Sequence, residues 1–302
     1  MPEFKVSTED PLSVLKSTRL ALENSRFVFI NEKKLEPMAE RIMERFNRGL
    51  FDLEQDYGST GDTEKDIQLI FIEDVVNFCF WPDKGKPKWQ VEWPAGNIVE
   101  GGWYAMKACF DRALVKGMPI LDAGYLADIS LENVQDFFRG TDGTEIPLIE
   151  QRMANLREAG KVLIQKYAGK FSKAVEAADF DAVKIVRLIV NDFPSFRDIS
   201  VLDGKEIFFL KRAQICPWDI SYVFKDSKQQ VKNLHHLTAL ADYKLPQVLN
   251  MFGILEYVDG LTAKVHNMTE IPHDSREEIE IRAATVWAVE FLRQRIPKLS
   301  AV

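Results

Sequence analysis

Helical periodicity dominates the pattern of apolar and polar positions along this chain. Apolar residues recur at three- and four-residue steps from Leu35 to Leu50, with charged residues between them. This spacing places the apolar side chains on one face and predicts an amphipathic helix over residues 35–50. Residues 182–193 and 277–295 show the same periodicity and are also expected to be helical.

Local start and stop signals bound two more helices. Ser130 is a suitable N-cap for a helix over residues 131–139, and a glycine follows that segment as a stop. Pro147 fits the start of a longer helix over about residues 148–168, because a first-turn residue needs no backbone N–H. Residues 67–80 are apolar around an acidic pair, and their pattern does not distinguish a helix from a strand.

Strand signals are few. The best lies in residues 199–210, where Asp203-Gly204 separates two apolar runs as in a tight hairpin. Residues 88–92 and 97–99, on either side of a Pro-Ala-Gly turn, could form a second hairpin. The sequence therefore predicts a mainly α fold with one or two small β-hairpins.

Nothing along the chain signals a boundary between independent domains. The sequence shows no internal repeat, low-complexity tract or long linker, and its 302 residues, 46% of them hydrophobic, suffice for a substantial core. We expect a single compact domain over residues 1–302. An N-terminal helical half of about 1–145 and a C-terminal half of about 146–302 are expected to enclose a cleft, which is the natural ligand site.

Charge and composition narrow the partners. The net charge is −7, whereas a dedicated duplex-binding protein usually carries a basic patch and a high isoelectric point. A small-molecule ligand is therefore expected rather than a stable nucleic-acid partner. No uncharged apolar run reaches the roughly 18 residues of a membrane span, and the first residues lack the basic and apolar regions of a secretory signal.

The cysteines and histidines do not suggest a metal site. The three cysteines are far apart and form no CxxC pair, and the four histidines share no metal-ligand spacing with them. These residues are Cys79, Cys109, Cys216, His235, His236, His266 and His273. Unpaired cysteines suit a reducing compartment, so we expect a cytoplasmic protein without a bound metal.

One short turn concentrates chemistry. Asp242, Tyr243 and Lys244 lie between two apolar segments, just ahead of Pro246. Because Pro246 fits the first turn of a helix, Asp242 should lie next to free backbone donors and the positive end of the helix dipole. A carboxylate there can cap the helix, or it can stay ionised and face a developing positive charge. The pattern alone leaves both uses open.

A second group of residues could bind a flat heterocycle. Aromatic faces stack such rings, and acids or amides read their donor edges. The alternative is that the aromatic rings simply fill the core. The candidate residues are Asp74, Asn77, Phe78, Trp81, Trp103 and Tyr125.

A third group brings charges next to apolar segments. Lys211 and Arg212 adjoin a strongly apolar strand end, where a partly desolvated cation could hold a phosphate or an acid. Arg197 and Asp198 precede the hairpin and are candidates for substrate contacts, with a plain ion pair between them as the alternative. A surface location is the alternative for these charges.

The usual catalytic templates are missing from the sequence. It contains no Walker loop, no GxGxxG after a strand, no GxSxG and no HExxH. Carboxylate and lysine chemistry remains, with Asp219 as a further acid. Glu278 and Arg282 stand at an i, i+4 spacing that favours a surface ion pair, although such a pair can also brace an active-site residue. This chemistry suits cleavage of a bond to an aromatic base, where a positive sugar centre forms.

Six motifs in order resemble the queuosine salvage protein family, over roughly residues 12 to 295. The motifs are Asp74…Asn77-Phe78-Cys79-Phe80-Trp81, Gly102-Trp103, Phe193-Pro194-Ser195-Phe196-Arg197-Asp198, Lys211-Arg212-Ala213-Gln214, Leu237-Thr238…Ala241-Asp242-Tyr243-Lys244-Leu245-Pro246-Gln247 and Glu280-Ile281-Arg282. Each motif alone is weak, and the order and spacing of all six make the resemblance specific. The chain departs from some members at Asn233, where they carry an acid, and at Leu240, where others carry phenylalanine.

The resemblance implies an N-glycosidase that releases queuine from queuosine 5′-monophosphate for salvage into tRNA. It implies a mainly α fold similar to helix-hairpin-helix DNA glycosylases. By motif, Asp242 matches the catalytic carboxylate and Lys211 its partner near the sugar phosphate. The implied base pocket is Asp74, Asn77, Phe78, Trp81 and Trp103, and the candidates for phosphate or carboxylate contacts are Arg197, Tyr243 and Lys244.

The released base would be a 7-deazapurine, which lacks the N7 atom that is usually protonated in a purine leaving group. Catalysis would then depend on stabilising the oxocarbenium-like sugar, and hydrolysis by a carboxylate would need water and no cofactor. Two alternatives remain open at this point: a base-excision DNA glycosylase, and a non-enzymatic helical interaction protein.

Overall fold

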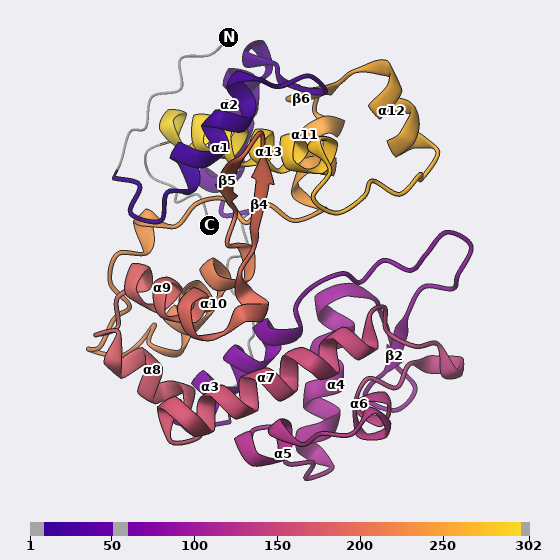
Figure 1. The fold of residues 1–302 in the computed structure, drawn as a ribbon, viewed down its shortest axis with the longest axis vertical. Coiled ribbons are helices and arrows are strands. Elements are labelled where there is room, and N and C mark those ends of the chain that lie inside the picture. Colours follow the sequence, from indigo (N-terminus) through magenta and orange to yellow (C-terminus); the bar gives the residue numbers. More distant parts are fainter. Residues whose placement is uncertain (1–8, 51–59, 297–302) are drawn as a thin grey trace.

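The computed structural model describes residues 9–50 and 60–296 and shows a mainly α protein (Figure 1). Within these ranges the chain forms α-helices and three small antiparallel strand pairs, which confirms the expected fold class. The implied similarity to helix-hairpin-helix DNA glycosylases stays a prediction. No helix among the described residues has both the length and the apolar content to cross a membrane.

The helices and strands alternate unevenly along the chain. The helices are α1 (Val14–Glu23), α2 (Leu35–Asn47), α3 (Thr63–Val76), α4 (Gly102–Val115), α5 (Ala123–Ala127), α6 (Leu131–Phe137), α7 (Ile149–Tyr167), α8 (Phe171–Ala177), α9 (Ala182–Asp192), α10 (Lys211–Val223), α11 (Leu245–Met251), α12 (Asp259–His266) and α13 (Arg276–Arg295). The strands are β1 (Val28–Ile30), β2 (Gln90–Glu92), β3 (Ile98–Glu100), β4 (Ile199–Leu202), β5 (Lys205–Phe208) and β6 (Leu255–Tyr257).

The segments with a clear helical period form helices close to their predicted bounds: α2, α6, α7, α9 and α13. Ser130 caps α6 as expected, since its side chain accepts a hydrogen bond from the N–H of Asn133. Residues 67–80 resolve into α3 and the segment after it. Every residue of α3 from Asp66 to Val76 is buried, and a helix buried on all sides has no polar face to give it an amphipathic pattern.

Both predicted hairpins form. In the β4–β5 hairpin, Asp203 and Gly204 both have positive φ angles, of 51° and 76°, as the favoured two-residue hairpin turns require. The β2–β3 hairpin pairs Gln90 with Glu100. A third pair, β1 with β6, joins Val28 to Tyr257 and was not predicted, because its strands are short and far apart in sequence.

Segments from both ends of the chain pack together. Helices α1 and α2 contact α13, whereas α3 contacts α7, α8 and α10 (Figure 1). Helices of the predicted N-terminal half, about residues 1–145, therefore pack against helices of the predicted C-terminal half, about 146–302. The predicted single domain with a cleft between these halves stays a prediction. Helix α10 packs on α3 and on α9, and this places its first residues near the end of α3.

An aromatic cluster fixes α3 to the segment that follows α9. The ring of Phe71 in α3 stacks on Phe171 with centroids 3.8 Å apart, and Phe193 and Phe196 lie at 4.9 and 5.8 Å from Phe71. All four side chains are buried. Part of the Phe193–Asp198 motif is therefore core packing, and it holds Asp198 close to the start of α10.

Candidate active site

Three of the motifs meet where α10 begins. The Nζ atom of Lys211, the first residue of α10, lies 3.5 Å from the backbone oxygen of Asn77, just beyond α3. Burial lowers the pKa of Lys211, and the charges of Asp242 and Asp74 act in the opposite direction. The structure thus brings Asp74, Asn77, Lys211 and Asp242 near one another, and their roles toward a ligand stay predictions.

Asp74 is a fully buried acid with an unused oxygen. Burial raises its pKa well above the ordinary value, the charge of Asp219 adds to this effect, and Lys211 partly offsets it. Its side chain is 1% exposed, and its Oδ2 atom has no hydrogen-bond partner. Because an unpaired buried polar atom is costly, this oxygen is suited to take a donor from a ligand.

Further buried charged groups lie close to Asp74, and no motif in the sequence marks most of them. Glu73 is 3% exposed, and burial raises its pKa to about 8. The Nζ atom of Lys107 in α4 lies 3.7 Å from Glu73 and 2.8 Å from Asp111. The signal that could have found this group is the acidic pair inside the apolar run of α3, because charges are rarely buried without partners.

Asp242 caps α11, as one of its two predicted uses requires. Its Oδ1 atom accepts hydrogen bonds from the N–H groups of Lys244 and Leu245, at 2.7 and 3.0 Å, and Pro246 lies in the first turn. The side chain is half-buried. Among the described residues no hydrogen bond engages its Oδ2 atom, so the cap leaves one carboxylate oxygen available for chemistry.

An exposed aromatic surface adjoins Asp242. Trp81 is 46% exposed, and its ring lies edge-to-face with that of Tyr243, with centroids 6.4 Å apart. The Nζ atoms of Lys244 and Lys88 lie 4.6 and 5.9 Å from the centre of the Trp81 ring. A half-exposed indole with two ammonium groups beside it is suited to contact a flat, negatively charged ligand.

Phe78 is held between two arginines. The guanidinium carbons of Arg152 and Arg212 lie 4.5 and 5.0 Å from its ring centre. Arg152 is fully buried and donates to the carbonyl oxygens of Val76, of Phe78 at 2.6 Å and of Cys79 at 2.7 Å. Burial lowers the pKa of Arg152 to about 9. This arginine, which the sequence analysis missed, fixes the segment that carries Asn77 and Phe78.

Two further candidates, Arg212 and Trp103, lie on helices α10 and α4. Arg212 donates to the carbonyls of Val75, at 2.8 Å, and Ser195. Trp103 is half-buried in α4, one turn before Lys107 and therefore on the same side of that helix.

Two candidates are not brought to Lys211. The Arg197 guanidinium donates to the backbone oxygens of Val190 and Asn191, both at 3.0 Å, at the end of α9. Tyr125 belongs to α5, which packs on α7 and lies away from α10 in Figure 1. Their predicted ligand contacts stay predictions.

Two surface hollows lie elsewhere. One, of about 610 Å³, is lined by residues of α3, α5 and α7 and of the segments just before α5 and α8, including Gln68, Asp122 and Lys170. The other, of about 360 Å³, includes Pro11, Arg197 and other residues around the end of α9. Neither is lined by Asp74, Lys211 or Asp242, and the candidate site is argued from the convergence of these side chains.

Gln214 joins two of the motifs. Its fully buried side chain accepts from the N–H of Thr238 at 2.8 Å and donates to the carbonyl of Phe209 at 2.9 Å. One amide thus links α10, which begins at Lys211, to the segment that leads to Asp242.

Replacing Gln214 with leucine is expected to lower the free energy of unfolding by about 2–3 kcal/mol, because it leaves a buried donor and a buried acceptor unpaired. Urea unfolding of purified protein measures this change. The matched control is Gln135→Leu, whose amide bonds Glu145 on the exposed surface; we expect a change within about 0.5 kcal/mol. Equal small losses in both variants would contradict the linking role.

Fold and site together define a mainly α protein whose candidate chemistry is carried by carboxylates and a desolvated lysine beside exposed aromatic rings. Residues 57–301 match the family model described as queuosine salvage protein. The chain belongs to the queuosine salvage protein family.

Several relatives carry one name, "Queuosine 5'-phosphate N-glycosylase/hydrolase". The relative from Sphaerobacter thermophilus is 42% identical over 294 residues, which cover 95% of this chain and 87% of the relative. Those from Mus musculus and Bos taurus are 35% and 34% identical, over 96% and 95% of this chain and 86% of each relative.

Proposed function

We propose that this protein is an enzyme that hydrolyses the N-glycosidic bond of queuosine 5′-phosphate and releases queuine. The observation that carries the proposal is the shared name of relatives from a bacterium and two mammals that align over nearly the whole chain. The convergence of Lys211 and Asp242 next to the buried Asp74 supports it, because a cation and a carboxylate are the charged groups that such a reaction needs.

In this proposal Asp242 stabilises the sugar as the bond to the base breaks. The two backbone donors at Oδ1 hold the carboxylate in place, and Oδ2 faces the positive charge that develops at C1′. A fixed carboxylate does this without reorganising during the reaction. It can then orient or deprotonate the attacking water.

Lys211 balances charge in the same site. In the substrate-free protein its ammonium group lies within electrostatic reach of Asp242 and Asp74. When a nucleotide binds, the same ammonium group is proposed to contact the 5′-phosphate or the sugar, since a desolvated cation binds phosphate strongly.

The base is proposed to lie against Trp81 and Tyr243, with the buried, unpaired Oδ2 atom of Asp74 forming a hydrogen bond with its edge. Asn77 and Trp103 complete this pocket in the proposal. We also propose that the enzyme acts in the cytoplasm, with a small-molecule substrate and without a stable nucleic-acid partner.

The direct test is to incubate the purified protein with queuosine 5′-phosphate and to measure free queuine by mass spectrometry. We expect time-dependent release of the base together with ribose 5-phosphate. The same protein incubated with duplex DNA that carries damaged bases should produce no abasic sites. Abasic sites without queuine release would replace the proposal by a DNA glycosylase, and binding without release would replace it by a binding protein.

A further inference from the structure

Asp198 and Arg282 form a two-point ion pair beside the candidate site. The Nη1 and Nη2 atoms of Arg282 donate to Oδ1 and Oδ2 of Asp198 at 2.8 and 2.6 Å. The guanidinium carbon lies 3.9 Å from the ring centre of Phe209. Arg282 comes from α13, and Asp198 precedes β4, so the pair joins two distant parts of the chain.

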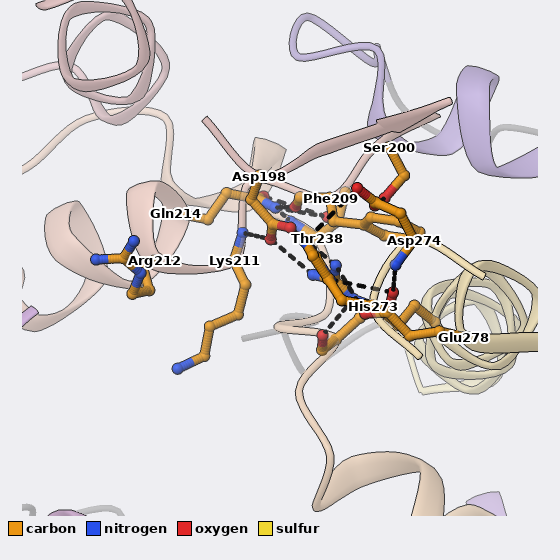
Figure 2. A network of polar contacts seen from close by, with 12 residues as sticks. Asp198, Ser200, Phe209, Lys211, Arg212, Gln214, Thr238, His273, Asp274 and Glu278 are labelled. Carbon is orange, nitrogen blue, oxygen red and sulfur yellow. Dashed lines mark hydrogen bonds and ion pairs between the residues drawn. The ribbon is translucent and has the colours of Figure 1, made fainter. Parts of the chain in front are cut away.

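Each partner also holds the backbone of a candidate catalytic segment. Oδ2 of Asp198 accepts a hydrogen bond from the backbone N–H of Lys211 at 2.9 Å, a contact that Figure 2 shows. Nε of Arg282 donates to the backbone oxygen of Ala241, the residue before Asp242, at 3.1 Å. One ion pair thus connects Lys211 to Asp242 through their backbones.

The pair has little capacity left for a ligand. The side chains of Asp198 and Arg282 are 24% and 12% exposed. Burial alone would raise the pKa of Asp198, but Arg282 and the N–H of Lys211 outweigh it and hold that pKa below its usual value. Three of the Arg282 nitrogens already donate to protein oxygens.

The helix that carries Arg282 is itself anchored. Oε2 of Glu280 accepts hydrogen bonds from Ser25, Arg26 and Phe27, at 2.7 to 3.0 Å. At the start of α13 the side chain of Ser200 donates to Asp274, as Figure 2 shows. These contacts hold α13 in place near Arg282. We therefore expect a change at Arg282 to displace the two backbone segments that the ion pair holds.

We propose that the Asp198–Arg282 pair is a positioning unit that sets the separation of Lys211 and Asp242 and does not contact substrate. This inference rests on the proposed function, because it assigns the two positioned residues to that reaction. It changes the expected role of Asp198 from ligand contact to support.

The test is Arg282→Lys, which keeps the positive charge but cannot form the two-point pair and also hold Ala241. Displacement of catalytic groups by about 1 Å can cost on the order of 100-fold, so we expect kcat for queuosine 5′-phosphate to fall about 10- to 100-fold. KM should rise by a smaller factor than kcat falls, because Lys211, the proposed phosphate contact, is displaced but keeps its charge. A large rise in KM with kcat unchanged would show a substrate contact and overturn the proposal.

A matched control lies on the same helix. Arg293 makes a similar two-point pair with Glu290, with both bonds at 2.7 Å, and contacts neither Lys211 nor the segment before Asp242. Arg293→Lys should leave kcat within about twofold. Equal losses of kcat in the two variants would show a general effect on the helix and would overturn the proposal.

A second readout does not depend on activity. The pKa of Lys211 can be followed by its rate of acetylation against pH, measured by mass spectrometry of the peptide that contains it. Burial is the main cause of its low pKa, so Arg282→Lys should move it upward toward the ordinary value, and Arg293→Lys should not. An unchanged Lys211 pKa in Arg282→Lys would overturn the positioning proposal, whether or not the wild type releases queuine. Failure of the wild type to release queuine would by itself refute only the proposed function.

Discussion

Asp242→Asn is expected to lower the turnover of queuosine 5′-phosphate by at least about 100-fold while leaving substrate binding nearly intact. In the proposed mechanism the loss follows from removing the negative charge that faces the sugar cation, since single preorganised electrostatic groups contribute about 100- to 1000-fold. The proposed base and phosphate contacts lie on other residues, so affinity for the substrate should change little.

Asparagine is the informative replacement because it separates the two uses of this side chain. Oδ1 of Asp242 caps α11 through the N–H groups of Lys244 and Leu245, and asparagine caps helices about as well as aspartate. The fold should therefore be as stable as that of the wild type. Asp242→Ala removes the cap as well and should cost about a further 1 kcal/mol of unfolding free energy.

The measurement is kcat and KM from queuine release, with substrate affinity from calorimetry on the inactive variant. The control is Asp122→Asn, because Asp122 caps α5 in the same way, through the N–H of Tyr125 at 2.7 Å, outside the candidate site. Near wild-type turnover by Asp242→Asn would mean that the carboxylate is only a helix cap.

A helix with one buried and one solvent-exposed face is the easiest kind to predict from sequence. Helices α2 and α9 show apolar residues at helical spacing because each packs one side on the core and turns the other to solvent. Helix α13 was predicted from the same spacing, although residues 283–288 in its middle are buried on all sides. Helix α3 was ambiguous because it is buried on all sides. Helix α10 was not predicted, since Pro217 lies inside it and proline normally ends a helical pattern.

The candidate site also contains residues that the sequence identifies and residues that it does not. Asp74, Lys211 and Asp242 were identified because they belong to ordered motifs, and the structure brings them together. Arg152 was missed because its partners are backbone carbonyls, and no pattern of side chains along the sequence reveals such contacts.

The motifs themselves are largely structural. Gln214 joins α10 to the segment before Asp242, and Glu280 anchors the start of β1. Arg282 belongs to a motif for which the sequence offered an i, i+4 pair with Glu278; that contact is long, at 3.7 Å, whereas the pair with Asp198 is short. Spacing along one helix predicted the weaker contact, because the stronger partner comes from a distant segment.

The buried acid Glu73 is expected to make the protein less stable as the pH rises. Burial raises its pKa from 4.5 to about 8 in the folded state. Between these pH values the folded chain retains a proton that the unfolded chain releases, so unfolding becomes more favourable with increasing pH. The full effect is at most on the order of 5 kcal/mol, which corresponds to roughly 1.4 kcal/mol for each pH unit in that window.

Glu73→Gln should remove this contribution while keeping the shape of the side chain. Lys107 keeps its ion pair with Asp111, at 2.8 Å, so the replacement leaves no cation unpaired. Urea unfolding at about pH 5.5 and about pH 7.5 should show the wild type losing about 2 kcal/mol more than the variant between the two conditions. The exposed Glu132→Gln is the control and should follow the wild type. Parallel pH dependence in all three proteins would show that Glu73 is already ionised in the folded state and that Lys107 compensates its burial.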